Sequence, residues 1–245
     1  MATLAVIMPT LNEEAYLEAA LWSVAFADEI IVVDSYSTDA TPKIAQQYAT
    51  IFLQRKFDNF SSQKNYALEH ATTDWVLFLD ADERITHSLQ QEILTAINSN
   101  THGGYKLNFP HFYMNRFLYH HSNDVLRLVK RKGASYKGLV HEKLTCEGSI
   151  GQLASPVLHF TYKGLSHFLA KKESYAWFQA EQLQKKGKKT SWGHLFIKPS
   201  WRFFSSYIIK GGFRDGIPGL TVAAINAYGV FQRYVKLMLL NKGMR

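Results

Sequence analysis

Residues 75–83 read Trp-Val-Leu-Phe-Leu-Asp-Ala-Asp-Glu, and this stretch decides the fold. Its five leading apolar residues have the length and composition of a strand that is buried on both faces of a parallel sheet. Asp80 and Asp82 follow where the strand ends, and because they are two positions apart, both side chains point to the same side of an extended chain. Ligands bind at the carboxyl ends of the strands in open α/β sheets, so these carboxylates are expected to face a ligand crevice.

Two carboxylates at such a place are suitable ligands for Mg²⁺ or Mn²⁺ that is also held by substrate phosphates. The stretch therefore predicts a divalent-cation site at Asp80 and Asp82. An isolated Asp-x-Asp is also typical of a polar turn that closes a strand, with Asp82 or Thr86 capping a helix that begins near Ser88. The rest of the chain decides between the two interpretations.

Predicted strands and helices alternate through the first half of the chain. The strands are expected at residues 4–8, 29–33, 51–53 and 75–79. Pro9 is expected to stop the first strand, and Asn12 to cap a helix over 13–26. The Thr-Pro pair at 41–42 is expected to open the second helix, and one of the serines at 61–62 to cap the third. This alternation predicts an α/β fold with a doubly wound, mostly parallel sheet.

Polar residues follow three of the predicted strands. They are Pro9, Thr10, Asn12 and Glu13 after the first strand, Asp34 and Ser35 after the second, and Asp80 and Asp82 after the fourth. Because the carboxyl ends of parallel strands share one edge of the sheet, a nucleotide is expected there. The sequence contains neither Gly-x-Gly-x-x-Gly nor Gly-Lys-Ser/Thr, which disfavours a dinucleotide-binding fold of the usual kind and a P-loop NTPase.

Three segments occur in a specific order: Ile-Met-Pro-Thr-Leu-Asn-Glu-Glu at 7–14, Ile-Val-Val-Asp-Ser-Tyr-Ser-Thr-Asp at 31–39, and Phe-Leu-Asp-Ala-Asp-Glu at 78–83. Together they resemble the inverting family-two glycosyltransferases of the GT-A fold. Residues 127–131, 138–144 and 211–216 resemble a narrower branch, the lipopolysaccharide inner-core β-glucosyltransferases. The resemblance implies that a hexose, glucose from UDP-glucose, is transferred with inversion to a lipid-linked saccharide such as the lipopolysaccharide inner core.

Such a transfer requires that the enzyme hold the base, neutralise the diphosphate and deprotonate an acceptor hydroxyl. Asp34 can accept the imide N–H of uracil; in the alternative interpretation it caps a turn. The resemblance also places these residues in the nucleotide-sugar site: Pro9, Thr10, Asn12, Glu13, Ser35 and Asp80. Glu13 is otherwise a surface acid that complements a helix dipole. The resemblance implies that Asp82, more directly than Asp80, holds the divalent cation, which stabilises negative charge as the diphosphate departs.

Four later residues complete the candidate site. Lys64 is expected to meet a phosphate, and Arg127 to pair with the donor diphosphate or with an acceptor phosphate. Each is otherwise a solvated charge. Glu142 is the candidate general base, because the base must come from beyond the nucleotide half and few other acids remain there; Asp124 is next in line. His141 is a candidate metal or diphosphate ligand, or else a structural histidine.

Charge divides the chain in two. Residues 1–150 contain 13 Lys and Arg against 17 Asp and Glu, whereas residues 151–245 contain 15 against 3. Together with the resemblance, this division leads us to expect a catalytic, nucleotide-sugar-binding GT-A domain at 1–150. The basic and aromatic appendage at 151–245 is expected to be helical and to be associated with the acceptor and with an anionic membrane surface.

Helical patterns in the second part cover residues 165–186 and 218–240. Asn226, Arg233 and Lys236 fall on one stripe of the second pattern, which favours a helix that lies in a membrane interface. The alternative is a helical cap that packs on the sheet domain. Binding of single-stranded nucleic acid is disfavoured, because the first half predicts no nucleic-acid fold.

Several features predict a cytoplasmic protein that is peripheral to the inner face of the cytoplasmic membrane. Cys146 is the only cysteine, so no intrachain disulfide can form. The apolar run at 4–8 is too short for a signal peptide, and no charge-free apolar stretch reaches the roughly 18 residues of a spanning helix.

Two other functions are less favoured. A sugar-1-phosphate nucleotidyltransferase would need a Gly-rich phosphate loop after the first strand, where this chain has none. A non-catalytic membrane-binding module is disfavoured because the acids that the chemistry needs occur together.

Overall fold

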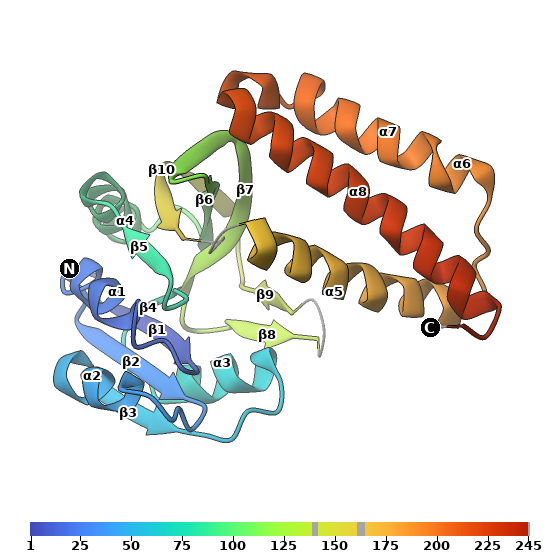
Figure 1. Ribbon diagram of the computed structural model, residues 1–245. Coiled ribbons are helices and arrows are strands. Elements are labelled where there is room, and N and C mark those ends of the chain that lie inside the picture. Colours follow the sequence, from blue (N-terminus) through green and yellow to red (C-terminus); the bar gives the residue numbers. More distant parts are fainter. Residues whose placement is uncertain (139–141, 161–164, 245) are drawn as a thin grey trace. The chain divides into compact units, whose positions relative to one another are not determined.

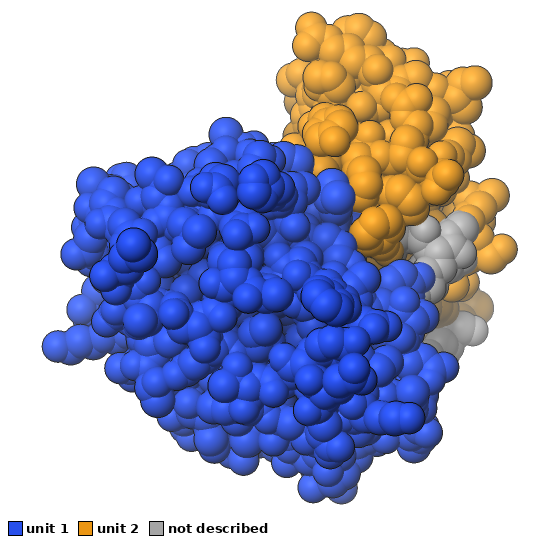
Figure 2. All heavy atoms as spheres, turned by 90° about the vertical axis from the view of Figure 1, so that its left-hand side faces the viewer, with its two compact units in different colours: residues 1–109, 123–159 blue, residues 110–122, 160–245 orange. Residues whose placement is uncertain are grey.

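The chain folds into two compact units (Figure 2). The computed structural model describes residues 1–138, 142–160 and 165–244. Unit 1 consists of Met1–Phe109 and Asn123–His159, and unit 2 of Pro110–Ser122 and Phe160–Arg245. The main division thus falls after His159 rather than after residue 150, because the strand that ends at His159 belongs to the large sheet.

The large sheet has eight strands in the order β3-β2-β1-β4-β7-β6-β10-β5 (Figure 1). The parallel part consists of β1 (Leu4–Thr10), β2 (Glu29–Asp34), β3 (Ile51–Gln54) and β4 (Trp75–Phe78). The other strands are β5 (Glu83–Ile85), β6 (Gly104–Tyr113), β7 (Arg116–Lys130) and β10 (Ile150–His159). β7 pairs antiparallel with β4, and β10 with β5. The sheet is therefore mixed, and a small β8 (Ser135–Lys137) and β9 (Lys143–Thr145) pair lies outside it.

Apolar side chains cover both faces of the parallel part. The helices that follow its strands are α1 (Leu17–Ser23), α2 (Thr41–Tyr48), α3 (Phe60–Glu69) and α4 (His87–Ser99). Leu4, Val6 and Met8 of β1 pack in one cluster with α1 and α4, whereas Ala5 and Ile7 pack in a second cluster with α3. Because both faces are buried, the strands are continuous apolar runs, and only their carboxyl ends carry polar side chains.

The four predicted parallel strands are present, Thr41 opens α2 with proline next to it, and Thr86 caps α4. The prediction that Pro9 stops the first strand is wrong, because β1 continues to Thr10. Pairing of β1 with β4 ends at Ile7, whereas pairing with β2 extends to Thr10. A proline is tolerated where the ladder has a partner on one side only.

Two predicted helix caps are also wrong. Asn12 has a left-handed backbone (φ 53°), whereas an N-cap residue is extended. It precedes α1 by several residues, and its Oδ1 accepts from the backbone N–H of Thr38 (2.9 Å). The cap of α3 is Asn59, whose Oδ1 accepts from the backbone N–H of Ser62 (2.9 Å). Neither error alters the strand ends.

Unit 2 is helical apart from the ends of β6 and β7. Its helices are α5 (Leu165–Lys185), α6 (Trp192–Leu195), α7 (Ile197–Phe204) and α8 (Gly216–Asn241), with a π-helical turn at Ser205–Ile209 and a 3₁₀ turn at Gly212–Asp215. The two helices that the sequence predicts are α5 and α8. Both α5 and α7 pack along α8 (Figure 1). Among the described residues, no helix combines the length and the apolar character that crossing a bilayer requires.

The polar stripe of α8 faces α5, whereas an interfacial helix turns its polar stripe to solvent, so this stripe does not support the prediction that α8 lies in a membrane interface. Lys236 Nζ lies 3.3 Å from Glu173 Oε1, and Arg233 Nη1 donates to Gln179 Oε1 (2.9 Å). Asn226 is buried as well. The exposed residues of α8 include, at helical spacing, Ile217, Leu220, Tyr228 and Phe231. Periodicity located the helix, but which face packs on a neighbour depends on α5.

Candidate active site

A cavity of about 330 Å³ lies at the carboxyl ends of the parallel strands. It is lined by Pro9, Thr10, Leu11, Glu13, Ser35, Phe57, Phe60, Gln63, Asp80, Ala81 and Asp82. The residues among these that the sequence predicts for a site are Pro9, Thr10, Glu13, Ser35, Asp80 and Asp82. They meet because each lies at or just beyond the carboxyl end of β1, β2 or β4, and these ends share one edge of the sheet. The remaining predicted residues do not line the cavity: Asn12, Asp34, Lys64, Arg127 and Glu142; His141 lies outside the described residues.

Asp34, at the end of β2, is fully buried, and both of its carboxylate oxygens accept hydrogen bonds. Oδ1 accepts from Thr10 Oγ1 (3.1 Å) and Ser37 Oγ (2.5 Å). Oδ2 accepts from the backbone N–H of Ser37 (2.9 Å) and from Gln54 Nε2 (3.4 Å). Asp34 thus joins the ends of β1, β2 and β3, and a contact with a uracil imide requires that one of these donors be displaced.

Asn12 holds the loop after β1 in place. Its backbone N–H donates to Ser37 Oγ (2.8 Å), in addition to the bond that its side chain accepts from Thr38. The backbone N–H of Glu13 donates to Thr41 Oγ1 (2.8 Å). The loops after β1 and β2 are therefore fixed to each other, which positions the cavity-lining side chains on both.

Arg127, on β7, bridges two acids. Its Nη2 lies 2.9 Å from Asp80 Oδ2 and 2.9 Å from Glu83 Oε1, and its guanidinium lies 5.2 Å from the ring centroid of Phe109. Partial burial raises the pKa of Asp80, but the charges of Arg127 and Lys64 outweigh it and hold that pKa well below its usual range. Burial raises the pKa of Glu83 to about 7 against the opposing charge of Arg127. Of the two acids, Asp80 thus has the lower pKa.

Asp82 pairs with His159, the last residue of β10. His159 Nε2 lies 3.2 Å from Asp82 Oδ2, and neither side chain is fully buried. Burial lowers the pKa of His159, but the hydrogen bond to Asp82 and the charge of Glu83 outweigh it, so the pKa lies above its usual value. The partner of Asp82 is thus a partly exposed histidine, which a bound cation could displace from the carboxylate.

Lys64 and Glu142, which the sequence predicts for different tasks, form an ion pair. Lys64 Nζ lies 3.4 Å from Glu142 Oε1 and 4.8 Å from the ring centroid of Tyr136. Lys64 is buried, whereas about a quarter of the Glu142 side chain is exposed (24%). The candidate base is thus held beside the candidate phosphate ligand.

The residues at the cavity fit a divalent cation that the substrate helps to bind. Asp80 and Asp82 both line the cavity, with 37% and 29% of their side chains exposed. Within the described ranges, no three His, Cys, Asp or Glu side chains are grouped closely enough to hold a metal by themselves. Mg²⁺ commonly uses only one or two carboxylates and takes its other ligands from phosphates and water. Asp80 and Asp82, which both line the cavity, could supply those carboxylates.

Sequence reasoning missed several residues of this region. Phe57 and Phe60 line the cavity with ring centroids 5.0 Å apart, and Gln63 Nε2 donates to Ser35 Oγ (3.0 Å). All three follow β3, so the rule applied to the other strand ends would have pointed to them. His159 carried no such signal, because its partners Asp82 and Glu83 are distant in the sequence. Glu83 comes just after β4, but its pairing with Arg127 spans 44 positions.

Comparison with known proteins identifies the class of fold and then the family. The mannosyltransferase PcManGT from Pyrobaculum calidifontis, solved in complex with GDP-Man and Mn²⁺, aligns with a TM-score of 0.57 at 15% identity, over 97% of this chain and 87% of that chain. The fold is therefore that of the GT-A glycosyltransferases, as predicted. Residues 5–154 match the sequence profile of Glycosyl transferase family 2. Since this match covers more than half of the chain, the chain belongs to that family and is a transferase.

Two relatives cover nearly the whole chain. An uncharacterized glycosyltransferase of Rickettsia felis is 30% identical over 259 residues, which span 97% of this chain and 90% of the relative. The lipopolysaccharide core biosynthesis glycosyltransferase LpsC of Rhizobium meliloti is 30% identical over 241 residues, 93% of this chain and 88% of LpsC. The similarity therefore extends through unit 2.

Proposed function

We propose that this chain transfers a hexose, glucose from UDP-glucose, with inversion to a lipid-linked saccharide such as the lipopolysaccharide inner core. The observation that carries the proposal is the convergence of Asp80 and Asp82 with Thr10, Glu13 and Ser35 around one cavity. Family membership supports glycosyl transfer, and the name of LpsC supports a lipopolysaccharide acceptor. The choice of uridine and glucose rests on the sequence resemblance.

The nucleoside is proposed to bind between the loops after β1, β2 and β3. Phe57 and Phe60 offer exposed ring faces in the cavity, on which a base can stack. Thr10, Glu13 and Ser35 then supply hydrogen-bonding groups for the base and ribose. Asp34 holds Thr10 in place by accepting the hydrogen bond of its hydroxyl. Asp34 can also accept a hydrogen bond from the uracil imide N–H if one of its present hydrogen-bond donors is displaced.

The diphosphate is proposed to lie near Asp80 and Asp82. A divalent cation held there, with Mg²⁺ and Mn²⁺ the candidates, would stabilise the negative charge of the leaving UDP. Arg127 Nη1 is buried and has no hydrogen-bond partner among the described residues. A buried donor without a partner destabilises a structure, so we assign this N–H to a substrate oxygen.

Glu142 is proposed to take the proton of the acceptor hydroxyl. Inverting transfer needs a single base and no enzyme nucleophile. Lys64 lies beside Glu142 and so supplies a positive charge close to the reacting groups. A carboxylate within hydrogen-bonding reach of the acceptor can act in this way.

Donor binding gives the first prediction. UDP-glucose with Mn²⁺, at about 100-fold over its Kd, is expected to raise the melting temperature by about 5–10 °C, since ligand binding at that excess adds about 2.7 kcal/mol to the free energy of unfolding. The measurement is a thermal-shift panel of UDP- and GDP-sugars with and without metal. Phe60→Ala is expected to reduce the shift. Equal shifts with GDP-mannose, or none with any sugar nucleotide, would refute the donor assignment.

Peripheral membrane association at the cytoplasmic face is proposed to use an apolar surface of unit 2. We name it the α6–α7 surface; it consists of Trp192, Phe196, Ile197, Trp201, Phe204, Ile208 and Ile209, all exposed. Lys198, Arg202 and Lys210 lie in the same segment. Aromatic side chains with neighbouring cations are typical of interfacial helices, and each Lys or Arg near an anionic leaflet contributes about 1 kcal/mol.

The second prediction tests this surface. The chain is expected to co-sediment strongly with phosphatidylglycerol vesicles and weakly with phosphatidylcholine vesicles. Binding should fall at high salt, because the Debye length shortens from about 8 Å at 0.15 M to about 3 Å at 1 M and screens the attraction. Trp201→Ala with Phe204→Ala should reduce sedimentation. Trp22→Ala, which removes an exposed tryptophan of α1, is the matched control. Equal sedimentation with both lipids, or with neither, would contradict the proposal.

A further inference from the structure

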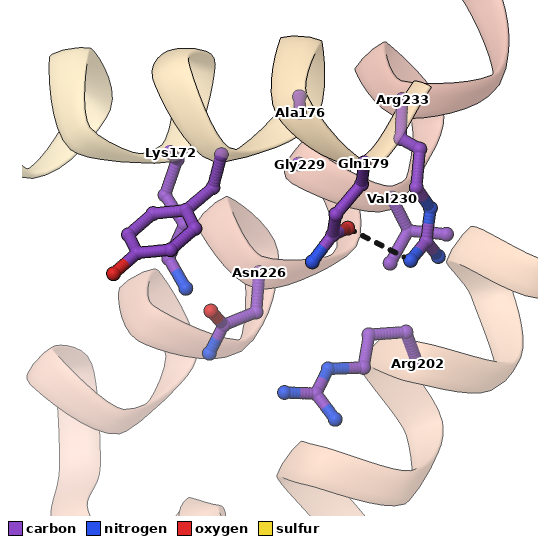
Figure 3. Close-up of a pocket in the computed structure, with 9 residues that line it drawn as sticks. Lys172, Ala176, Gln179, Arg202, Asn226, Gly229, Val230 and Arg233 are labelled. Atoms are coloured by element: carbon purple, nitrogen blue, oxygen red, sulfur yellow. Dashed lines mark hydrogen bonds between the residues drawn. The ribbon is translucent and has the colours of Figure 1, made fainter. Parts of the chain in front are cut away.

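A second cavity lies entirely within unit 2 (Figure 3). It has a volume of about 430 Å³ and is lined by Lys172, Tyr175, Ala176 and Gln179 of α5, Arg202 of α7, and Asn226, Gly229, Val230 and Arg233 of α8. None of these lining residues is acidic. The cavity is therefore polar and positively charged, unlike the apolar contacts between α5 and α8 further along, around Leu237.

Three cationic side chains reach this cavity from three different helices. Lys172, Arg202 and Arg233 extend toward the same space, with the Asn226 amide beside them (Figure 3). Among the described residues, no carboxylate forms an ion pair with any of the three, whereas Lys236, one turn further along α8, is paired with Glu173 at 3.3 Å. Like charges held together without a counterion repel one another, so the arrangement favours an anionic ligand.

Two of the cationic side chains at the cavity, Arg233 and Lys172, are unfavourably placed without a bound anion. Arg233 donates from Nη1 to Gln179 Oε1 (2.9 Å), but its buried Nε–H has no acceptor among the described residues. Burial, together with the charges of Arg202 and Lys171, lowers the pKa of Lys172 to about 8. A bound anion would relieve both effects, because it accepts from the guanidinium and offsets the repulsion between the cations.

We propose that this cavity binds the phosphate group of a phosphorylated ligand. Guanidinium groups bind phosphate oxygens through two parallel N–H donors, and Arg202 and Arg233 bring two such groups together with an ammonium and an amide. Arg202 shares α7 with Trp201 and Phe204 of the α6–α7 surface. A lipid phosphate is thus one source of the ligand, and a free phosphate is the other; only the choice of the lipid rests on the proposed function.

The test uses the full chain and two double variants of equal charge. Lys172→Gln with Arg202→Gln removes two cavity cations, and Lys186→Gln with Arg214→Gln removes two exposed cations that do not line the cavity. Inorganic phosphate and glycerol 3-phosphate are titrated by calorimetry at constant ionic strength. We expect the cavity variant to bind both about tenfold or more weakly, and the control variant to bind like the unmodified chain.

Vesicles distinguish the sources of the phosphate. Phosphatidylcholine vesicles with and without phosphatidic acid are compared for both variants. If the cavity variant, but not the control variant, loses the preference for phosphatidic acid, the ligand is a lipid phosphate. If the cavity variant loses binding of the soluble phosphates but keeps the preference for phosphatidic acid, the ligand is a free phosphate. Equal weakening in both variants, or no phosphate binding by the unmodified chain, would overturn the proposal. Because Arg202 is exposed, Arg202→Gln by itself serves if the double variant does not fold.

The readout also separates this inference from the proposed function. UDP-glucose hydrolysis in the absence of acceptor depends on the cavity of unit 1 and is expected to be unchanged in both double variants. A chain without transferase activity can still bind phosphate in unit 2, and an active transferase can fail to bind it.

Discussion

Asp82→Asn is expected to lower sugar transfer by about 10³-fold or more while the fold stays intact. The substitution removes a charge and leaves the volume almost unchanged. A metal ion at a diphosphate supplies several kcal/mol of charge stabilisation in the transition state, and each 1.36 kcal/mol is worth about tenfold in rate. The measurement is UDP release from UDP-glucose with saturating acceptor over a range of Mn²⁺ concentrations.

The control must account for the contact of Asp82 with His159 (3.2 Å). Thermal unfolding of the variant shows whether loss of this contact alters the fold. Asp58→Asn is the matched substitution, because Asp58 is an exposed acid paired with Arg55 and does not line the cavity. If Asp82→Asn retains near-normal turnover at low Mn²⁺, the metal assignment is wrong.

Glu142→Gln is expected to lower kcat by about 10²–10⁴-fold, which is the usual contribution of a general base, and to leave the KM for donor nearly unchanged. Its ion pair with Lys64 is also lost, so we expect the free energy of unfolding to fall by about 1–3 kcal/mol. Kinetics at a temperature well below unfolding separate the two effects. Glu69→Gln, at an exposed acid of α3, is the matched control.

An unaffected kcat in Glu142→Gln would move the base to another acid, with Asp124 next. Asp124 is exposed, and its Oδ1 accepts from Asn108 Nδ2 (3.0 Å) and Gln152 Nε2 (3.2 Å). Asp124→Asn would then lower kcat instead. If donor affinity falls in Glu142→Gln and kcat does not, Glu142 serves to position Lys64 and is not the base.

The sheet edge was predictable from sequence because its signals are local. Each parallel strand is a short apolar run, and the polar residues follow it directly, as Asp80 follows Trp75–Phe78. The contacts that shape the site are long-range: Arg127 meets Asp80 across 47 positions and Glu83 across 44. No spacing rule connects such residues, so the sequence predicted that Arg127 binds phosphate but not that it bridges two acids.

Long-range contacts also limited what the sequence could predict about the helices of residues 151–245. A repeat of polar residues located α8, yet the direction in which Asn226, Arg233 and Lys236 point is set by α5. The left-handed conformation of Asn12 was missed for a related reason. Its hydrogen bond to Thr38 depends on the loop after another strand, whereas a capping pattern considers only the residues that follow.

The most direct test of the central claim is transfer of radiolabelled hexose from UDP-glucose to purified lipopolysaccharide truncated in its inner core, with the anomeric configuration of the product determined by NMR. We expect metal-dependent incorporation of a β-linked hexose with equimolar UDP release, and loss of this incorporation in Asp82→Asn. No incorporation with any UDP-hexose, or release of pyrophosphate from UTP and a sugar 1-phosphate instead, would contradict the central claim.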